Sequence, residues 1–158
     1  MSKLGRVLII EDSDTKWQDV ATCLEAVYAK RLELSRASTI KEANELVSGS
    51  IWNLILLDIS MNIRPSSAGQ GAGGHDTVGG LKVAERMFYL GHEAPVIIVT
   101  AFDAFPAQEQ SRNAVLGLED VIRRASSILG ENLRGWIRYG DQDWKTKLIS
   151  QVSSVGGV

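Results

Sequence analysis

Three short runs of Val, Ile and Leu constrain the fold of this chain more than any other feature of its sequence. They are the continuous apolar segments Val7–Ile10, Leu54–Leu57 and Val96–Val99. Runs of this length without polar alternation are typical of strands buried on both faces, as in a parallel sheet covered by helices. Two weaker strand candidates, Leu32–Ser35 and Trp136–Tyr139, bring the expected number of strands to five.

Segments with helical periodicity alternate with these strands. Apolar residues recur at spacings of three and four, and the stripes run over 17–27, 40–47, 81–88, 115–129 and 144–152. Strand and helix thus alternate five times, which predicts a parallel sheet with right-handed crossovers. The predicted fold class is a doubly wound α/β protein, in which ligands bind at the carboxyl ends of the strands.

Composition favours one domain in the cytoplasm. A chain of 158 residues with 44% hydrophobic and 23% charged residues is that of an ordinary globular domain. Its net charge of −2 offers no cationic surface to nucleic acid or anionic lipid. No apolar stretch approaches the ~20 residues of a membrane span, and we recognise no signal peptide. We expect a domain over residues 1–153 and a tail or linker over 154–158.

Acidic residues directly follow two of the apolar runs. Glu11 and Asp12 follow the first run and Asp58 follows the next one, while Thr100 follows the run at 96–99. Because the first and third strands are neighbours in a doubly wound sheet, the three carboxylates are expected at one edge. At ~4 Å and an effective dielectric of ~20, each like-charged pair costs about 4 kcal/mol. The cluster therefore calls for a hard divalent cation or a protonated acid.

Three segments resemble the signature segments of two-component response-regulator receiver domains. These are RVLIIEDSD, LILLDISMN and VIIVTA. The acid pair after strand one matches Glu11 and Asp12, and the phosphoacceptor aspartate followed three residues later by Met matches Asp58. The hydroxyl-plus-small pair matches Thr100 and Ala101. The resemblance covers nearly the whole chain in order and implies a CheY-like, flavodoxin-like sheet with strand order 2-1-3-4-5.

The resemblance implies a phosphorylation switch. Asp58 would accept phosphate from a histidine kinase or phosphotransfer protein, and Mg²⁺ would be held by Glu11, Asp12, Asp58 and the backbone carbonyl of Ser60. Thr100 would contact the phosphoryl group, and Trp136 falls at the position of the switch aromatic residue. A downstream protein would dock on the face of helix four, strand five and helix five, and a homodimer is compatible with the family. No enzymatic activity beyond self-directed phosphoryl transfer is expected.

Two features depart from the family pattern. Receiver domains have a lysine at the end of strand five, followed by proline, whereas Tyr139 and Gly140 stand at these positions. A tyrosine hydroxyl can donate a hydrogen bond but cannot neutralise an anion. Arg138 should point to the other face of the strand, and the lysines at 145 and 147 would need an unusual loop to reach back. The second departure is a long Gly-rich insertion between Asp58 and the third helix.

These departures leave other functions open. The domain could be a pseudo-receiver that signals by binding without phosphorylation. A small haloacid-dehalogenase-like phosphatase is a further alternative, suggested by Asp12, Asp14 and the late acids at 141 and 143, although it leaves Asp58 unexplained. The string GQGAGG fits a dinucleotide fingerprint, but it does not lie in a strand-to-helix turn. The pair His75–Asp76 is weak evidence for a metal site.

Overall fold

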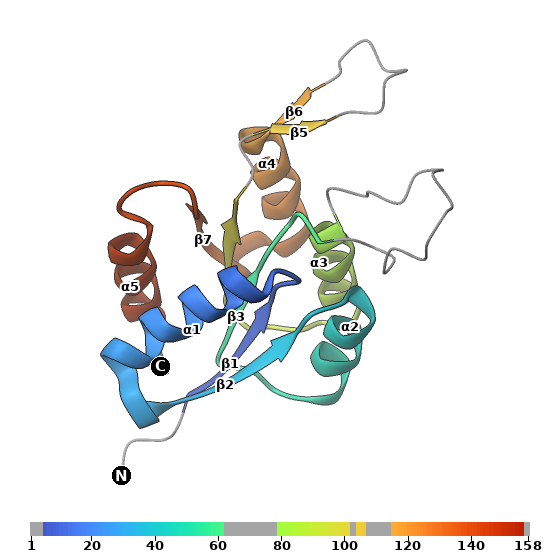
Figure 1. The fold of residues 1–158 in the computed structure, drawn as a ribbon. Coiled ribbons are helices and arrows are strands. Elements are labelled where there is room, and N and C mark those ends of the chain that lie inside the picture. Colours follow the sequence, from blue (N-terminus) through green and yellow to red (C-terminus); the bar gives the residue numbers. More distant parts are fainter. Residues whose placement is uncertain (1–4, 62–78, 102–103, 107–114, 157–158) are drawn as a thin grey trace, which may run out of the picture.

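The computed structural model describes residues 5–61, 79–101, 104–106 and 115–156. A five-stranded sheet with helices on both faces makes up most of it (Figure 1). The sheet strands are β1 (Gly5–Ile10), β2 (Leu32–Ala37), β3 (Leu54–Leu57), β4 (Val96–Thr100) and β7 (Leu133–Arg138). The helices are α1 (Asp14–Tyr28), α2 (Ile40–Gly49), α3 (Gly79–Tyr89), α4 (Leu118–Leu129), α5 (Trp144–Ser154) and the short 3-10 turns η1 (Ala29–Arg31) and η2 (Gly130–Asn132).

The strand order β2-β1-β3-β4-β7 confirms the predicted doubly wound topology. All four pairings in this sheet are parallel, and β1 pairs with β3 from Val7 opposite Leu54 to Ile10 opposite Leu57. The carboxyl ends of β1 and β3 therefore lie side by side. Because the residues that follow these two strands are Glu11, Asp12 and Asp58, the topology alone brings the acids to one edge.

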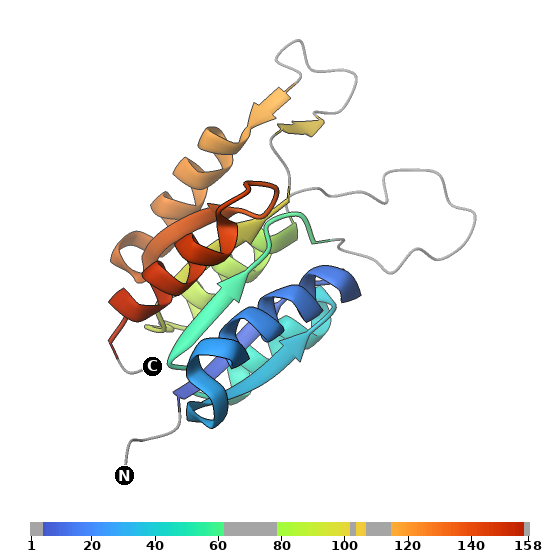
Figure 2. The same ribbon diagram turned by 60° about the vertical axis from the view of Figure 1, so that its left-hand side comes forward.

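The sheet is covered by two layers of helices. Helices α1 and α5 lie on one face, and α2, α3 and α4 lie on the other (Figures 1 and 2). Each face has its own apolar cluster, one including Leu24, Ile97 and Leu148 and the other including Ile55, Met87 and Val121. All four residues of β3 are buried, as expected for a strand with apolar side chains on both faces.

Two details differ from the sequence expectation. Strands β5 (Ala104–Pro106) and β6 (Val115–Gly117) form a separate antiparallel pair ahead of α4, so the fifth strand of the main sheet is β7. At the C-terminal end of the chain, α5 continues to Ser154. The side chain of Val155 is buried in the apolar cluster between the sheet and helices α1 and α5. The packed part of the chain thus reaches two residues beyond the predicted boundary at 153.

The start of α3 lies against the segment that follows β3. Gly80 donates a backbone hydrogen bond of 2.9 Å to the carbonyl of Ile59. A Cβ atom at residue 79 would overlap the backbone oxygen of Met61, and one at residue 80 would overlap the backbone oxygen of Asp58. Two consecutive glycines at 79 and 80 are therefore what allows this helix to begin so close to the acid cluster.

Several sequence features lie outside the described residues. They are the fingerprint-like string at 69–74, the pair at 75–76 and most of the Gly-rich insertion. Over the described residues, no helix combines the length and the apolar character that crossing a membrane requires. The cytoplasmic location stays a prediction from the sequence.

Candidate phosphorylation and metal site

Three carboxylates meet at the carboxyl edge of the sheet. One oxygen from each of Glu11, Asp12 and Asp58 can be chosen so that all three lie within 4.8 Å of one another. Glu11 and Asp58 are both 3% exposed, whereas Asp12 is half-buried. The backbone N–H of Asp58 donates to the carbonyl of Ile10 at 3.0 Å, which fixes the two strand ends relative to each other. The convergence predicted from the sequence is confirmed.

A lysine that the sequence analysis did not consider lies inside this cluster. Lys16, in the first turn of α1, is 4% exposed. Its Nζ lies 2.6 Å from Oε2 of Glu11 and 3.3 Å from Oδ2 of Asp58. It also donates to the backbone carbonyl of Val99 at 2.8 Å. Two carboxylates and a backbone carbonyl thus surround the ammonium group, so this buried charge is partnered.

The local sequence explains why Lys16 points inward. Ser13 caps α1, because its hydroxyl accepts a hydrogen bond from the backbone N–H of Lys16 at 3.3 Å. Four and eight residues after Lys16 come Val20 and Leu24, which are 2% and 0% exposed. Lys16 therefore belongs to the buried stripe of α1. That spacing is a signal present in the sequence, and it could have identified the lysine.

Burial and the neighbouring carboxylate dominate the electrostatics of Glu11. Desolvation, followed by repulsion from Asp58, raises the pKa of Glu11 to about 8, against the opposing effect of Lys16. The backbone N–H of Ser13 also donates to Oε1 of Glu11 at 2.9 Å. Burial and the Asp58 charge thus oppose ionisation of Glu11, while the Lys16 ammonium favours it.

Asp58 is held in place by the residue two positions after it. Ser60 donates its backbone N–H to Oδ1 of Asp58 at 3.0 Å, and its hydroxyl to the same oxygen at 2.8 Å. These bonds fix the orientation of the carboxylate without excluding a metal ion, because each carboxylate oxygen has further lone pairs. The donor set of three carboxylates is the hard oxygen chemistry that Mg²⁺ prefers, so the residues present fit this ion.

Thr100 lies at the end of β4, next to the carbonyl that accepts from Lys16. Its side chain is fully buried, and its backbone carbonyl accepts from the N–H of Tyr139 at 2.8 Å. The structure thus places Thr100 on the same edge of the sheet as the acids, between the strand ends of β3 and β7.

Tyr139 does not fill the place of the missing lysine. Its hydroxyl donates to the Asp19 carboxylate on α1, and its ring packs against Trp144 with centroids 5.0 Å apart. The hydrogen bond to Asp19, together with desolvation and the nearby negative charge, raises the pKa of Tyr139 to about 12. The ring centroid lies 5.8 Å from Nζ of Lys16. Tyr139 thus borders the acid cluster through Lys16.

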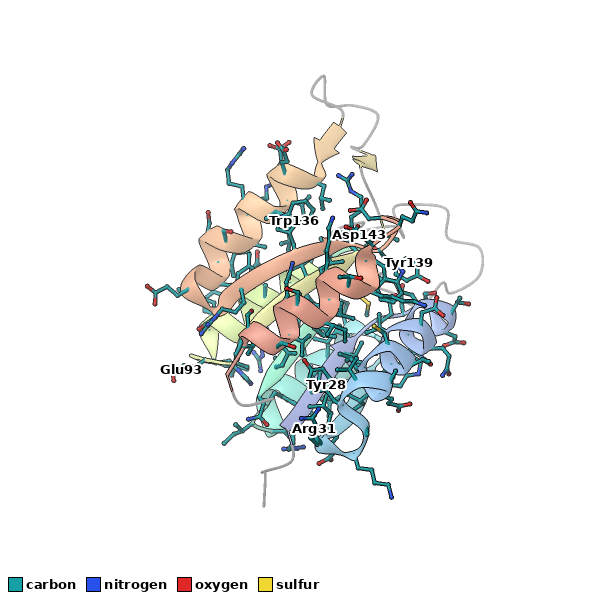
Figure 3. All side chains as sticks on the ribbon, turned by 90° about the vertical axis from the view of Figure 1, so that its left-hand side faces the viewer. Tyr28, Arg31, Glu93, Trp136, Tyr139 and Asp143 are labelled. Atoms are coloured by element: carbon teal, nitrogen blue, oxygen red, sulfur yellow. The ribbon has the colours of Figure 1, made fainter. Side chains whose placement is uncertain are left out.

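Trp136 lies on the other side of β7. Its side chain is 40% exposed, and Figure 3 shows it beside α4, away from Tyr139. Strand alternation explains the difference, because residues three apart on a strand face opposite sides. The lysines at 145 and 147 are engaged elsewhere: the first lies over the ring of Trp144, and the second pairs with the carboxylates at 141 and 143.

The solved structures that resemble this chain have the receiver fold. A CheY-like response regulator receiver domain protein from Methanospirillum hungatei is 20% identical with a TM-score of 0.63, covering 96% of this chain and 92% of that one. A signal receiver domain from Clostridium thermocellum is 16% identical with a TM-score of 0.66, covering 98% of both chains. The chain thus has the CheY-like receiver fold.

A curated relative agrees with the fold. The Detocs response regulatory protein DtcB of Enterobacter cloacae is 26% identical over 153 residues, which are 95% of this chain and 99% of that protein. No family model matches the chain. The resemblance found in the sequence is confirmed: over nearly its whole length the chain is similar to a response regulatory protein, and its fold is that of CheY-like receiver domains.

Proposed function

We propose that this receiver domain is a Mg²⁺-dependent phosphoacceptor, with Asp58 as the residue that takes the phosphoryl group. The observation that carries the proposal is the buried Asp58 carboxylate, held beside Glu11 and Asp12 at the carboxyl edge of the sheet. A buried carboxylate costs free energy unless it is paired or coordinates a metal ion, so this setting suits an acid that binds a cation. Phosphorylation at Asp58 then changes the charge of the edge and switches protein–protein contacts.

Four residues would hold the metal ion. Glu11, Asp12 and Asp58 offer carboxylate oxygens, and Ser60 offers its backbone carbonyl. When bound, Mg²⁺ supplies charge neutralisation to the phosphoryl oxygens during transfer. Because Asp12 keeps part of its surface exposed, solvent reaches the cluster at this residue.

Transfer to Asp58 is a displacement at phosphorus. An oxygen of the Asp58 carboxylate forms the new O–P bond while the P–N bond of a kinase phosphohistidine breaks, and the electron pair leaves with the imidazole nitrogen. The Ser60 bonds orient the attacking carboxylate. Thr100, buried at the end of β4, would donate its hydroxyl to a phosphoryl oxygen.

The partners follow from this chemistry. A histidine kinase or phosphotransfer protein would supply the phosphoryl group, and a downstream protein would bind the face made by α4, β7 and α5. The exposed side chain of Trp136 on this face supports that docking site. Trp136 would change its orientation when Asp58 is phosphorylated, and Tyr139 would stay with Asp19.

Incubation with phosphoramidate and Mg²⁺, followed by intact mass measurement, tests the proposal. We expect a single phosphate adduct in the wild-type protein and none in Asp58→Asn. Asp120→Asn, which changes a partly exposed aspartate on α4, is the matched control and should keep the adduct. An adduct that persists in Asp58→Asn would contradict the assignment of this residue.

One observation favours a second function, the pseudo-receiver. Lys16 pairs with both Glu11 and Asp58 and offsets one of their negative charges without a metal ion. A domain whose acid cluster already holds an internal cation can signal by binding alone. Absence of an adduct in the wild-type protein, together with absence of Mg²⁺ binding in a calorimetric titration, would select this function.

A further inference from the structure

The acid cluster contains a cation that comes from an unexpected element. Lys16 belongs to α1, and its ammonium group lies between the carboxylates of Glu11 and Asp58. A lysine is rarely this deeply buried unless its charge is paired, and here two carboxylates and a backbone carbonyl pair with it. A solvent-facing role for this residue is excluded, because only 4% of it is exposed.

The position of the ammonium group matches what a phosphoryl group on Asp58 would need. Phosphorylation replaces one negative charge at residue 58 by roughly −1.5 to −2 and adds acceptor oxygens. The Nζ atom of Lys16 is already 3.3 Å from Oδ2 of Asp58, which is within ion-pairing distance. A charge-assisted hydrogen bond to a phosphoryl oxygen is among the strong interactions that a lysine makes.

Three other basic residues near this edge have partners of their own. Arg36 donates to the backbone carbonyls of Glu11 and Asp12 and pairs with the carboxylate of Asp14. The lysines at 145 and 147 contact the Trp144 ring and two exposed acids. Within the described part of the chain, Lys16 is therefore the basic residue best placed to serve Asp58.

The enclosed space around this group is small. A cavity of about 10 Å³, lined by Lys16, Glu11, Asp58 and apolar neighbours, remains between α1 and the sheet. This is about the room that one water molecule needs. Lys16 thus fills the inner side of the acid cluster, and Tyr139 covers it with its ring.

We propose that Lys16 is the catalytic cation of this receiver, contacting the phosphoryl group on Asp58 in the place of the lysine that the family carries at the end of its last strand. This inference rests on the proposed phosphoacceptor function. No bond to Lys16 is made or broken during transfer. The ammonium group exchanges its ion pair with the Asp58 carboxylate for a hydrogen bond to a phosphoryl oxygen and keeps its proton.

The test compares four proteins: wild type, Lys16→Met, the exposed-lysine control Lys41→Met, and the double variant Lys16→Met/Tyr139→Lys. The rate of adduct formation with phosphoramidate and saturating Mg²⁺ is followed by intact mass. Loss of Lys16 should slow the reaction at least about a hundredfold, the scale of one lost charge-stabilising donor. Lys41→Met should match the wild type.

The double variant separates a charge requirement from a packing requirement. The double variant places a lysine at residue 139, directly after β7 and next to the position that Lys16 vacates. Its rate should be at least about tenfold higher than that of Lys16→Met. Calorimetry gives a readout besides transfer: removing the competing cation should tighten Mg²⁺ binding by about tenfold. A merely structural lysine does not predict the recovery of the rate, whereas the tighter Mg²⁺ binding reports only that the charge of Lys16 acts on the acid cluster.

The outcomes are distinguishable. If the wild type forms no adduct, the proposed function fails and this inference falls with it. If the wild type forms the adduct and Lys16→Met forms it at the same rate, the inference alone is overturned. Should Lys16→Met fail to fold, as judged by circular dichroism, the double variant decides, because a folded but inactive double variant would overturn the role of the charge.

Discussion

Helix α1 and strand β7 flank the same edge of the sheet, but they contribute opposite kinds of residue to it. The start of α1 buries a charged side chain, Lys16, with 4% exposure. Strand β7 carries Trp136, which is 40% exposed, and is followed directly by Tyr139, whose hydroxyl donates to Asp19 on α1. The comparison teaches that the acid cluster needs a positive charge at one position in space. A residue on α1 can supply that charge as well as a residue at the end of β7 can.

The largest expected effect comes from removing the cation on α1. Lys16→Met should lower the free energy of unfolding by about 3 kcal/mol, because two buried carboxylates lose their partner. Urea denaturation at neutral pH measures it, and adding Glu11→Gln to Lys16→Met should recover part of the loss. A loss as small as that of the exposed Lys41→Met would break the comparison.

A pair of glycine substitutions extends the comparison to a third element. Gly80→Ala, at the start of α3, should cost about 2 kcal/mol, since the new methyl group overlaps backbone atoms of Asp58 and Ile59. Gly135→Ala on β7 meets the flexible end of the Gln151 side chain and should cost no more than about 0.5 kcal/mol. Thermal unfolding of the two variants should therefore rank them in this order, and equal losses would contradict it.

The hydrogen bond between β7 and α1 should have a smaller effect. Tyr139→Phe removes the hydroxyl that donates to Asp19 and should lower stability by about 1 kcal/mol. Equilibrium urea unfolding at pH 7 measures the loss. A Phe variant as stable as the wild type would show that the ring, and not its hydroxyl, joins the two elements.

The smallest expected effect is a pH dependence at the alkaline end. The pKa of Tyr139 is raised from 10.0 to about 12, so the folded protein favours the protonated hydroxyl. This contribution is fully present below pH 10 and is lost as pH rises from 10 towards 12. The difference in melting temperature between wild type and Tyr139→Phe should shrink over this range, and a constant difference would argue against it.

Much of the fold could be predicted from the sequence, because short, continuous apolar runs such as 7–10, 54–57 and 96–99 are typical of parallel strands buried on both faces. The acid cluster followed from the same topology. Lys16 was missed because a lysine in the first turn of a helix is usually solvated, and its buried partners come from residues 11, 58 and 99. The hydrogen bond between Tyr139 and Asp19 joins residues 120 positions apart. Local sequence patterns do not predict a contact over such a separation.

The glycine at residue 80 has a mechanical consequence. With no side chain between them, the first turn of α3 and the peptide unit of Asp58 are closely packed, so we expect a shift of one to displace the other. A probe on the exposed side chain of Lys82, two residues further along, would therefore sense strain at the acid edge directly.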